Sequence, residues 1–342
     1  MSEGQKHRAL CFRFVCALSG LLMMVSTGHA DDGHGRENHG MGILGIRSQA
    51  IGQSLRLTMP MLIPGDIPTG WRGYLGATWT NVWANDAAFL LDYEMLDTVA
   101  GVGYGFNERW GMAVFVDNRS YFGGAMDDFI AGFHNLFGID QDGRDAAPRG
   151  RSIISDPAIQ NQTSSIPANE LDNTGLSLLL NSNIDFGYPG WPSMNIYGVT
   201  RYALVPAKIF KKSDRFDYGL GVGLSKRWAL RWYTHAVLGY TLYADRGPTA
   251  PGNVVFGDQQ FTGMFALAWQ YSPALALMTQ YLYSSAVIET IPALDNASHE
   301  VHLGFKWLLS KTCVLDFALI ENIITMDNSP DFGLHLGVSI GM

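Results

Sequence analysis

The residues whose types and spacing most resemble a chemical site lie in one acidic stretch, DQDGRDAAPR, at 140–149. Asp140, Asp142 and Asp145 carry the carboxylate oxygens that calcium prefers. An EF-hand loop also needs Gly at its sixth position and Glu at its twelfth, and this stretch has neither. We therefore predict no metal site and favour ion pairs that latch the loop, between Arg144 or Arg149 and Asp127, Asp128 or Asp145.

Hydrolysis is the second chemistry to consider, because it needs a nucleophile beside a histidine and a third group that orients the histidine. His302 and His335 fall on the same face of the alternating segments described below. Ser339 shares the face of His335 but lies four residues away, and the sequence contains no G-x-S-x-G motif. We therefore predict that the protein is not an enzyme, with a lipid hydrolase as the minor alternative.

The elements that carry these residues follow a period of two. In the last eleven residues, FGLHLGVSIGM, apolar side chains alternate with small or polar ones up to the final residue. This period indicates a β-strand with one apolar face. A terminal strand of this kind must be paired, which predicts either the edge of a sandwich or the closing strand of a membrane barrel.

Alternating segments recur along the chain and predict an all-β protein, an antiparallel transmembrane β-barrel of about 12 strands. The connections alternate between short turns, such as NER at 107–109, and mostly longer loops. An even number of strands places the N-terminus and the C-terminus of the barrel on the same side, the periplasmic side with the short turns. The predicted strands are near 71–84, 89–106, 109–120, 173–186, 194–206, 215–227, 229–243, 258–271, 274–288, 297–308, 313–325 and 331–342.

The alternation also assigns each side chain to lipid or lumen. Near 215–227, large apolar residues such as Phe216 and Leu220 are predicted to face lipid, and glycines such as Gly219 to face the lumen. The polar face carries Gly, Ala, Ser and Asn more than Lys and Glu, which disfavours a soluble sandwich. The lumen candidates with functional side chains are Asp217, His302, Lys306 and His335.

Composition agrees with a membrane barrel. Charged residues make up 16% of the chain, against a usual share of about a quarter, and the net charge of -8 argues against nucleic acid as a partner. Residues 1–30 resemble a signal peptide with a cut after Ala30. No disulfide is expected, because Cys313 is the only cysteine after that cut. No cofactor is predicted.

The remaining chain divides into residues 31–70 and a barrel over 71–342. Residues 31–70 are predicted to form a periplasmic segment, either plug-like or an early strand. Pro60, Pro64 and Pro68 argue against a central strand in it.

One long extracellular loop, 121–172, far exceeds the usual connection length. Apolar residues at helical spacing predict a short amphipathic helix over 126–137. We expect this helix to dock into the lumen or mouth, which the glycines at 219, 221 and 223 leave room for; rim cover and disorder are the alternatives. The gate candidates are Asp128, Phe129, Ile130, Phe133, His134, Phe137, Gly143, Arg144, Asp145 and Arg149.

The stretch DDFIAGFHNLFGIDQDGRDAAPR resembles the most characteristic part of a proteobacterial family called domain of unknown function 3187. That family shows D-x-F-I-x-x-F-H, then F-G, G-R-D and P-R. MGILGIRSQAIGQSL resembles its opening, with Ser48 where Asn is common, and WTNVWAND resembles the segment that follows. The resemblance covers most of the mature chain. It implies an outer-membrane β-barrel without an assigned activity, adds Pro148 to the motif positions and supplies no catalytic residue.

Together these observations predict a narrow gated channel for small solutes, apolar ones included, in the outer membrane of a Gram-negative bacterium. Outer-membrane lipid, the barrel-assembly machinery and a small-molecule solute are the expected partners. A closed structural or partner-binding barrel is the main alternative.

Overall fold

The structure is a computed structural model. It describes residues 38–59, 70–86, 89–124, 126, 132, 153–155, 166–184, 191–208, 215–244, 255–289, 294–322, 324 and 328–341. Within these residues, β-strands dominate, as the period of two predicts.

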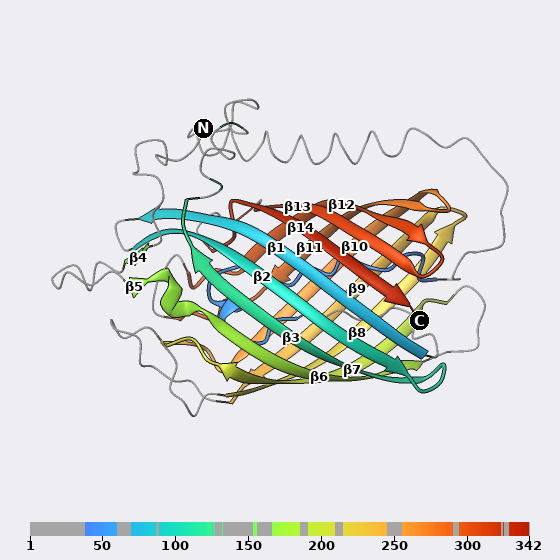
Figure 1. Cartoon of the computed structure of the whole chain (residues 1–342), viewed down its shortest axis with the longest axis horizontal. Coiled ribbons are helices and arrows are strands. Elements are labelled where there is room, and N and C mark those ends of the chain that lie inside the picture. Colours follow the sequence, from blue (N-terminus) through green and yellow to red (C-terminus); the bar gives the residue numbers. More distant parts are fainter. Residues whose placement is uncertain are drawn as a thin grey trace.

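Twelve long antiparallel strands form a barrel (Figure 1). β1 pairs with β2 on one side and with β14 on the other, so the sheet closes on itself. The prediction of a 12-strand antiparallel barrel is confirmed, with strand ends shifted by no more than a few residues. The strands are β1 (Gly70–Asp86), β2 (Phe89–Gly105), β3 (Trp110–Phe122), β6 (Asn173–Ile184), β7 (Ser193–Val205), β8 (Phe216–Ala229), β9 (Trp232–Tyr243), β10 (Gln259–Ser272), β11 (Leu275–Ser284), β12 (Ser298–Ser310), β13 (Cys313–Asn322) and β14 (Phe332–Gly341).

The closing seam explains why the chain alternates to its end. β14 pairs with β1 from Arg72↔Gly341 to Asn81↔Phe332, and its other edge pairs with β13. Residues 333–340 of this terminal strand are therefore paired on both sides, so β14 leaves no free edge there at which another chain could add a strand. Figure 1 shows β14 beside β1, with the C-terminus at one end of the barrel.

The two ends of the barrel differ. One end, called the short-turn end, holds tight connections such as Phe106–Arg109 between β2 and β3 and Leu230–Arg231 between β8 and β9. β1 begins at this end and β14 finishes there. The other end, called the loop end, holds most of the longer connections, including the one between β3 and β6.

That long connection contains elements that the sequence did not predict. β4 (Ile153–Ser155) pairs with β2 at Leu90–Asp92, and β5 (Ile166–Pro167) pairs with β4. β3 ends opposite Glu94, so β2 extends beyond it and leaves an edge that β4 covers. A 3-10 helix, η4 (Ala168–Leu171), follows. The amphipathic helix predicted over 126–137 falls almost wholly outside the described residues.

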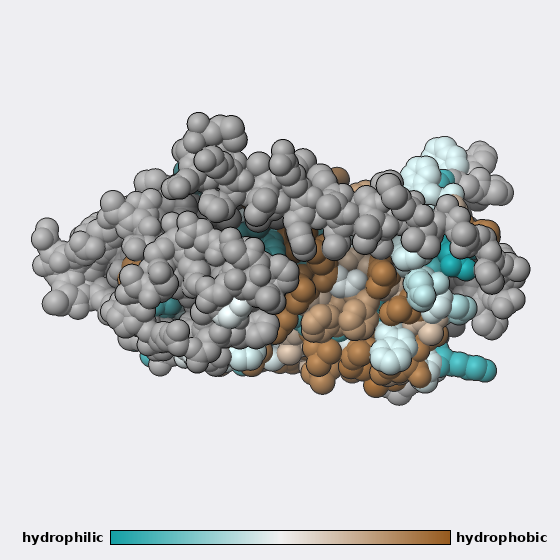
Figure 2. Space-filling view, turned by 90° about the horizontal axis from the view of Figure 1, so that it is seen from above, coloured by the Kyte–Doolittle hydropathy of each residue, from teal (hydrophilic) through white to brown (hydrophobic). Residues whose placement is uncertain are grey.

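The exterior of the barrel is apolar. On β8, Phe216, Tyr218, Leu220 and Leu224 are exposed, whereas Asp217, Gly219 and Gly221 are buried, as the predicted alternation requires. Large apolar side chains are exposed at 31 positions of the described strands and turns, which is far more than a water-soluble surface carries. Where grey atoms do not cover the face in Figure 2, brown apolar side chains fill the middle and paler ones lie toward one end. Within the described residues, no helix is long and apolar enough to cross a bilayer.

Candidate functional site in the barrel lumen

Residues 38–59, named here the luminal segment, lie inside the ring of strands. Every residue from Ile46 to Met59 is buried, and the wall of the barrel supplies the contacts. In Figure 1 the segment is the blue trace seen between the strands. It contains one 3-10 turn, η1 (Gln53–Leu55), and no strand. The bounds predicted for the N-terminal region, 31–70, stay a prediction because 31–37 and 60–69 lie outside the described residues.

The course of the segment follows from its hydrogen bonds. The Asn38 side chain donates to the Trp191 carbonyl oxygen (3.0 Å) at the short-turn end. Ser54 hydrogen-bonds to the Tyr121 hydroxyl (3.0 Å) at the loop end. The luminal segment therefore runs nearly the full length of the lumen before it turns back.

Apolar contacts hold part of the segment. Leu44, Ile46, Leu57 and Met59 share a buried cluster with inward side chains of the wall. Ile51 and Leu55 belong to a second cluster at the loop end. Burial of these groups stabilises the luminal segment inside the barrel, at about 25 cal/mol for each Å² of apolar surface removed from water.

The first ionic contact in the middle of the lumen involves Arg47. Its guanidinium donates to Asp97 on β2, and its Nη1 lies 3.7 Å from Asp117 Oδ2 on β3. Asp117 also accepts a hydrogen bond from Arg201 Nη2 on β7 (2.8 Å). A Cβ on Gly175 would lie 2.2 Å from Arg201 Nε, so glycine at this position makes room for the arginine. Arg47 therefore joins a network that already exists on the wall.

A second ionic contact holds Arg56. Its Nε donates to Asp217 Oδ1 (2.9 Å), and the backbone N–H of Leu57 donates to Asp217 Oδ2 (2.9 Å). The guanidinium carbon also lies 4.7 Å from the centre of the Tyr243 ring. Arg119 Nη1 donates to the Arg56 carbonyl oxygen (3.0 Å). Asp217 thus binds a planar cation and a backbone donor together, in a geometry suited to guanidinium.

Glu300 on β12 is the third anchor. It accepts hydrogen bonds from Ser48 Oγ (2.7 Å) and from the Gln49 backbone N–H (3.0 Å). Ser298 Oγ donates to the same carboxylate (3.2 Å), and His302 Nε2 lies 3.6 Å from it. The carboxylate therefore fixes the middle of the luminal segment to β12.

Nearer the short-turn end, Lys306 and Asp316 hold the backbone. Lys306 Nζ donates to the Ile43 carbonyl oxygen (2.7 Å), and the Gly45 N–H donates to Asp316 Oδ2 (3.4 Å). His335 Nε2 lies 3.7 Å from the same carboxylate oxygen. Charged groups of the wall thus bind the segment along most of its length.

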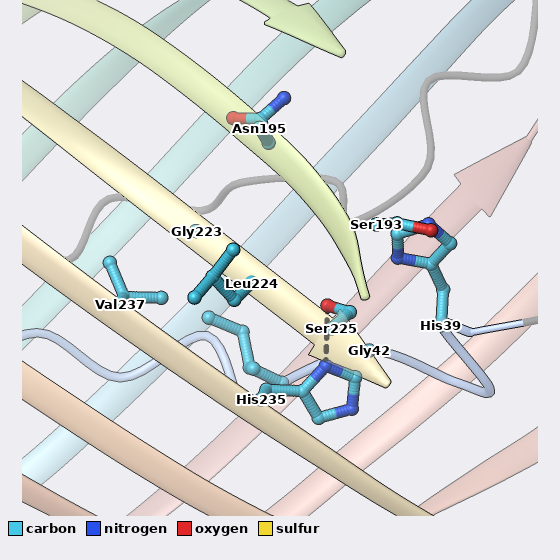
Figure 3. Close-up of a pocket in the computed structure, with 10 residues that line it drawn as sticks. His39, Gly42, Ser193, Asn195, Gly223, Leu224, Ser225, His235 and Val237 are labelled. Carbon is cyan, nitrogen blue, oxygen red and sulfur yellow. Dashed lines mark hydrogen bonds between the residues drawn. The ribbon is translucent and has the colours of Figure 1, made fainter. Parts of the chain in front are cut away.

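A small cavity of about 20 Å³ lies beside the start of the segment, with room for about one water molecule. Figure 3 shows His235 pointing into it, hydrogen-bonded to Ser225, with His39 and Ser193 across the space. The distance from Ser225 Oγ to His235 Nδ1 is 2.9 Å. This Ser–His pair was not predicted from the sequence, because ten residues and a turn separate the two.

The pair does not make a hydrolytic site. His235 Nε2 is buried without a hydrogen-bond partner among the described residues, so no carboxylate orients the ring. A second set, Thr78, His335 and Asp316, has the order of a triad, with 2.8 Å from Thr78 Oγ1 to His335 Nδ1. Asp316 Oδ2 also accepts a hydrogen bond from the Gly45 N–H, so this carboxylate binds the luminal segment as well. No group of three or more potential metal ligands occurs in the part of the chain that the structure describes.

The predicted site residues separate into two groups. Asp217, His302, Lys306 and His335 are buried on inward positions of β8, β12 and β14, with His302 and Lys306 both on β12. Asp217 and Lys306 contact the luminal segment directly, whereas His302 and His335 lie beside carboxylates that bind it. The ten gate candidates between Asp128 and Arg149 lie outside the described residues, so their roles stay predictions.

The glycines expected to admit the long loop have other neighbours. A Cβ on Gly219 would lie 3.3 Å from atoms of Leu57 and Met59, and a Cβ on Gly221 would overlap the Tyr197 ring. The prediction that these glycines leave room for the loop is therefore wrong for Gly219 and Gly221, because the luminal segment and Tyr197 already fill the space. Arg47 and Arg56 were not predicted as functional residues either, because their stretch of the chain shows neither strand nor helix period.

Comparison with known proteins adds a family. A family model described as "Protein of unknown function (DUF3187)" matches residues 20–342. No curated protein matches.

Solved structures similar to the chain include the NanC porin, with 10% identity, a TM-score of 0.48 and coverage of 79% of this chain and 100% of that chain. The COG4313 outer membrane channel from Pseudomonas putida F1 has 12% identity, a TM-score of 0.48 and coverage of 82% and 100%. The CymD monoaromatic hydrocarbon channel has 10% identity, a TM-score of 0.39 and coverage of 80% and 89%.

Proposed function

This chain belongs to the family of proteins of unknown function DUF3187, and we propose that it forms a narrow outer-membrane channel for small solutes, which the luminal segment closes. The apolar exterior of the barrel supports a position in a bilayer, and the signal-like residues 1–30 support export to the outer membrane of a Gram-negative bacterium.

The observation that carries the proposal is the charge on the inner wall. Buried inward-facing side chains of the described strands include five acidic and three basic residues. Apolar residues in place of a buried ion pair are often neutral or stabilising, so stability alone does not explain this lining. A lumen that fills with water when the segment leaves does explain it. The residues are Asp97, Asp117, Asp217, Glu300, Asp316, Arg119, Arg201 and Lys306.

A permanently closed structural or partner-binding barrel is the second candidate. The two apolar clusters between the luminal segment and the wall favour it, because they would be exposed to water in an open lumen. The ionic contacts and the apolar contacts therefore point to different functions, and only a measurement of conduction separates them.

Gating by the long loop and a preference for apolar solutes are finer parts of the proposal. Both rest on the apolar residues of 126–137, with Phe129, Phe133 and Phe137 as lining groups and His134 beside them. In this proposal the loop controls the loop end of the lumen while the luminal segment controls its interior.

The test is single-channel conductance in planar bilayers, with the mature protein, a variant lacking 38–59 and a variant lacking 124–150. Each sample is first shown to be a folded barrel by its changed gel migration before and after boiling. We expect a nearly closed mature protein and steady conduction from the variant lacking 38–59. Folded barrels that conduct in none of the three forms would favour the closed structural barrel. Conduction only after removal of 124–150 would assign the gate to the loop.

A further inference from the structure

The luminal segment balances the charge of the lumen. The buried inward-facing wall carries five acidic and three basic side chains, so it is negative when considered alone. The only charged residues of the segment are Arg47 and Arg56, and each contacts a wall carboxylate. With the segment in place, these buried side chains of the lumen number five acidic and five basic. When the luminal segment leaves the lumen, the wall keeps its excess of acidic side chains. The half-buried Arg72 and Arg227 lie toward the short-turn end, outside this buried set.

The wall also presents a preformed site for a planar cation. Asp217 lies on β8 directly opposite Arg201 on β7 and Tyr243 on β9, so its position is fixed by the register of three strands. Asp217 is 3% exposed and Tyr243 is 5% exposed. A carboxylate beside an aromatic face is the combination that binds guanidinium and ammonium groups, through charge-assisted hydrogen bonds and a cation–π contact. Arg56 shows this mode of binding in the closed state.

We propose that the open lumen is cation-selective, and that Asp217 and Tyr243 bind the guanidinium or ammonium group of the solute at the place that Arg56 occupies in the closed state. This inference rests on the proposed channel function, and it assigns organic cations as the substrate class in place of the apolar solutes that residues 126–137 suggest. Such a solute competes with Arg56 for Asp217 and so favours the open state. Inorganic cations pass through the same acidic lumen without the aromatic contact.

The first experiment measures selectivity in a chain that keeps all its charges. Gly239→Leu serves to open the lumen, because a Cβ at 239 would lie 2.8 Å from the Met59 Cβ. Gly263→Leu is the matched control, because a Cβ at 263 has no neighbour nearer than 3.9 Å. In a potassium chloride gradient, we expect the opened channel to give a reversal potential of the sign for potassium. Adding Asp97→Asn and Asp217→Asn to Gly239→Leu should reduce the preference several-fold. A channel that prefers chloride would overturn the inference.

The second experiment tests the site without conduction. Arg56→Ala leaves the carboxylate of Asp217 without its guanidinium, and trypsin cleavage after Arg47 then reports release of the luminal segment. We expect cleavage to become faster than in the unaltered protein, and ethylguanidinium chloride to slow it several-fold, while sodium chloride at equal concentration does not. The double variant Arg56→Ala with Asp217→Asn should show no rescue. Asp316→Asn in the Arg56→Ala background should keep the rescue, because Asp316 contacts Gly45 rather than Arg56.

The two experiments separate the possible failures. If neither Gly239→Leu nor the variant lacking 38–59 conducts while both are folded, the channel function fails, and the rescue experiment still decides whether Asp217 binds guanidinium. If the opened variants conduct but ethylguanidinium gives equal protection with and without Asp217, the channel stands and the assigned site is wrong.

Discussion

The ion pairs of this protein differ in how much free energy is lost when one partner is removed, and burial explains the difference. Arg56 and Asp217 form an ion pair with side chains that are each 4% exposed. Lys208 and Glu170 form a pair at 3.5 Å with side chains that are 70% and 41% exposed. Removal of one partner from a buried pair leaves an uncompensated charge, which costs about 3–5 kcal/mol, whereas an exposed pair contributes about 0–1 kcal/mol.

We therefore predict that Arg56→Gln weakens the closed state by about 3–5 kcal/mol, since Asp217 then loses its counter-ion. Lys208→Gln is the control and should change little, because both charges of its pair are solvated. Trypsin cleavage at Arg47, measured on the folded barrel, reports the open fraction of the luminal segment. Equal cleavage rates in the two variants would show that the Arg56 pair does not hold the segment.

Parity along the strands is enough to place some of these residues. Because side chains alternate between faces, Asp217, His302, Lys306 and His335 could be assigned to one face from the sequence alone. Their partners could not. Arg56 lies 161 positions from Asp217, and Ser48 lies 252 from Glu300. Such contacts depend on the closed topology and on the path of an irregular segment, and neither is encoded in a local period.

Among the elements, β9 shows how a strand is shaped to fit the luminal segment. Gly239 faces the lumen beside Met59, whereas a Cβ on Gly263 of β10 would meet its nearest atoms at 3.9 Å, an ordinary contact distance. Only the inward glycine is required by a close approach of another part of the chain.

We predict that Gly239→Leu displaces the luminal segment and raises the conductance of the mature protein, because a leucine side chain and Met59 cannot occupy the same space. Gly263→Leu should fold and stay closed. Bilayer recordings on both proteins, after the gel-migration check for folding, measure the difference. Silent but folded Gly239→Leu channels would mean that the lumen repacks around the larger side chain.

The long strands were predictable and the short elements were not, for a physical reason. Segments of ten to seventeen residues repeat the inward–outward pattern often enough to be recognised, as β1 and β2 do. β4 and β5 have only three and two residues, so they show no period. β4 forms because β2 extends beyond β3, which is a property of the assembled sheet.

At the scale of the whole molecule, one chain forms both the barrel and the luminal segment inside it. The outer face of the strands is apolar and suits lipid. The inner face carries charged side chains, which need either an oppositely charged group or water. The luminal segment supplies such groups. The first residue of the luminal segment, Asn38, lies at the short-turn end of the barrel. Asn38 Nδ2 donates to Ser193 Oγ (3.1 Å), and Asn38 Oδ1 accepts from the Arg227 N–H (3.2 Å).

Because of this contact, a disulfide at position 38 can fix the start of the luminal segment to β7. In a Cys313→Ser background, Asn38→Cys with Ser193→Cys should form a disulfide, because the two native side chains are in hydrogen-bond contact. The segment would then be tied to β7 at one end and continue into β1 at the other. We predict that oxidised protein carrying Gly239→Leu conducts poorly and that dithiothreitol restores its current. The single variant Asn38→Cys in the same background should conduct with or without the reductant. Full conduction by the oxidised protein would show that the lumen opens while the end of the segment stays at β7, so that only the part near Met59 moves.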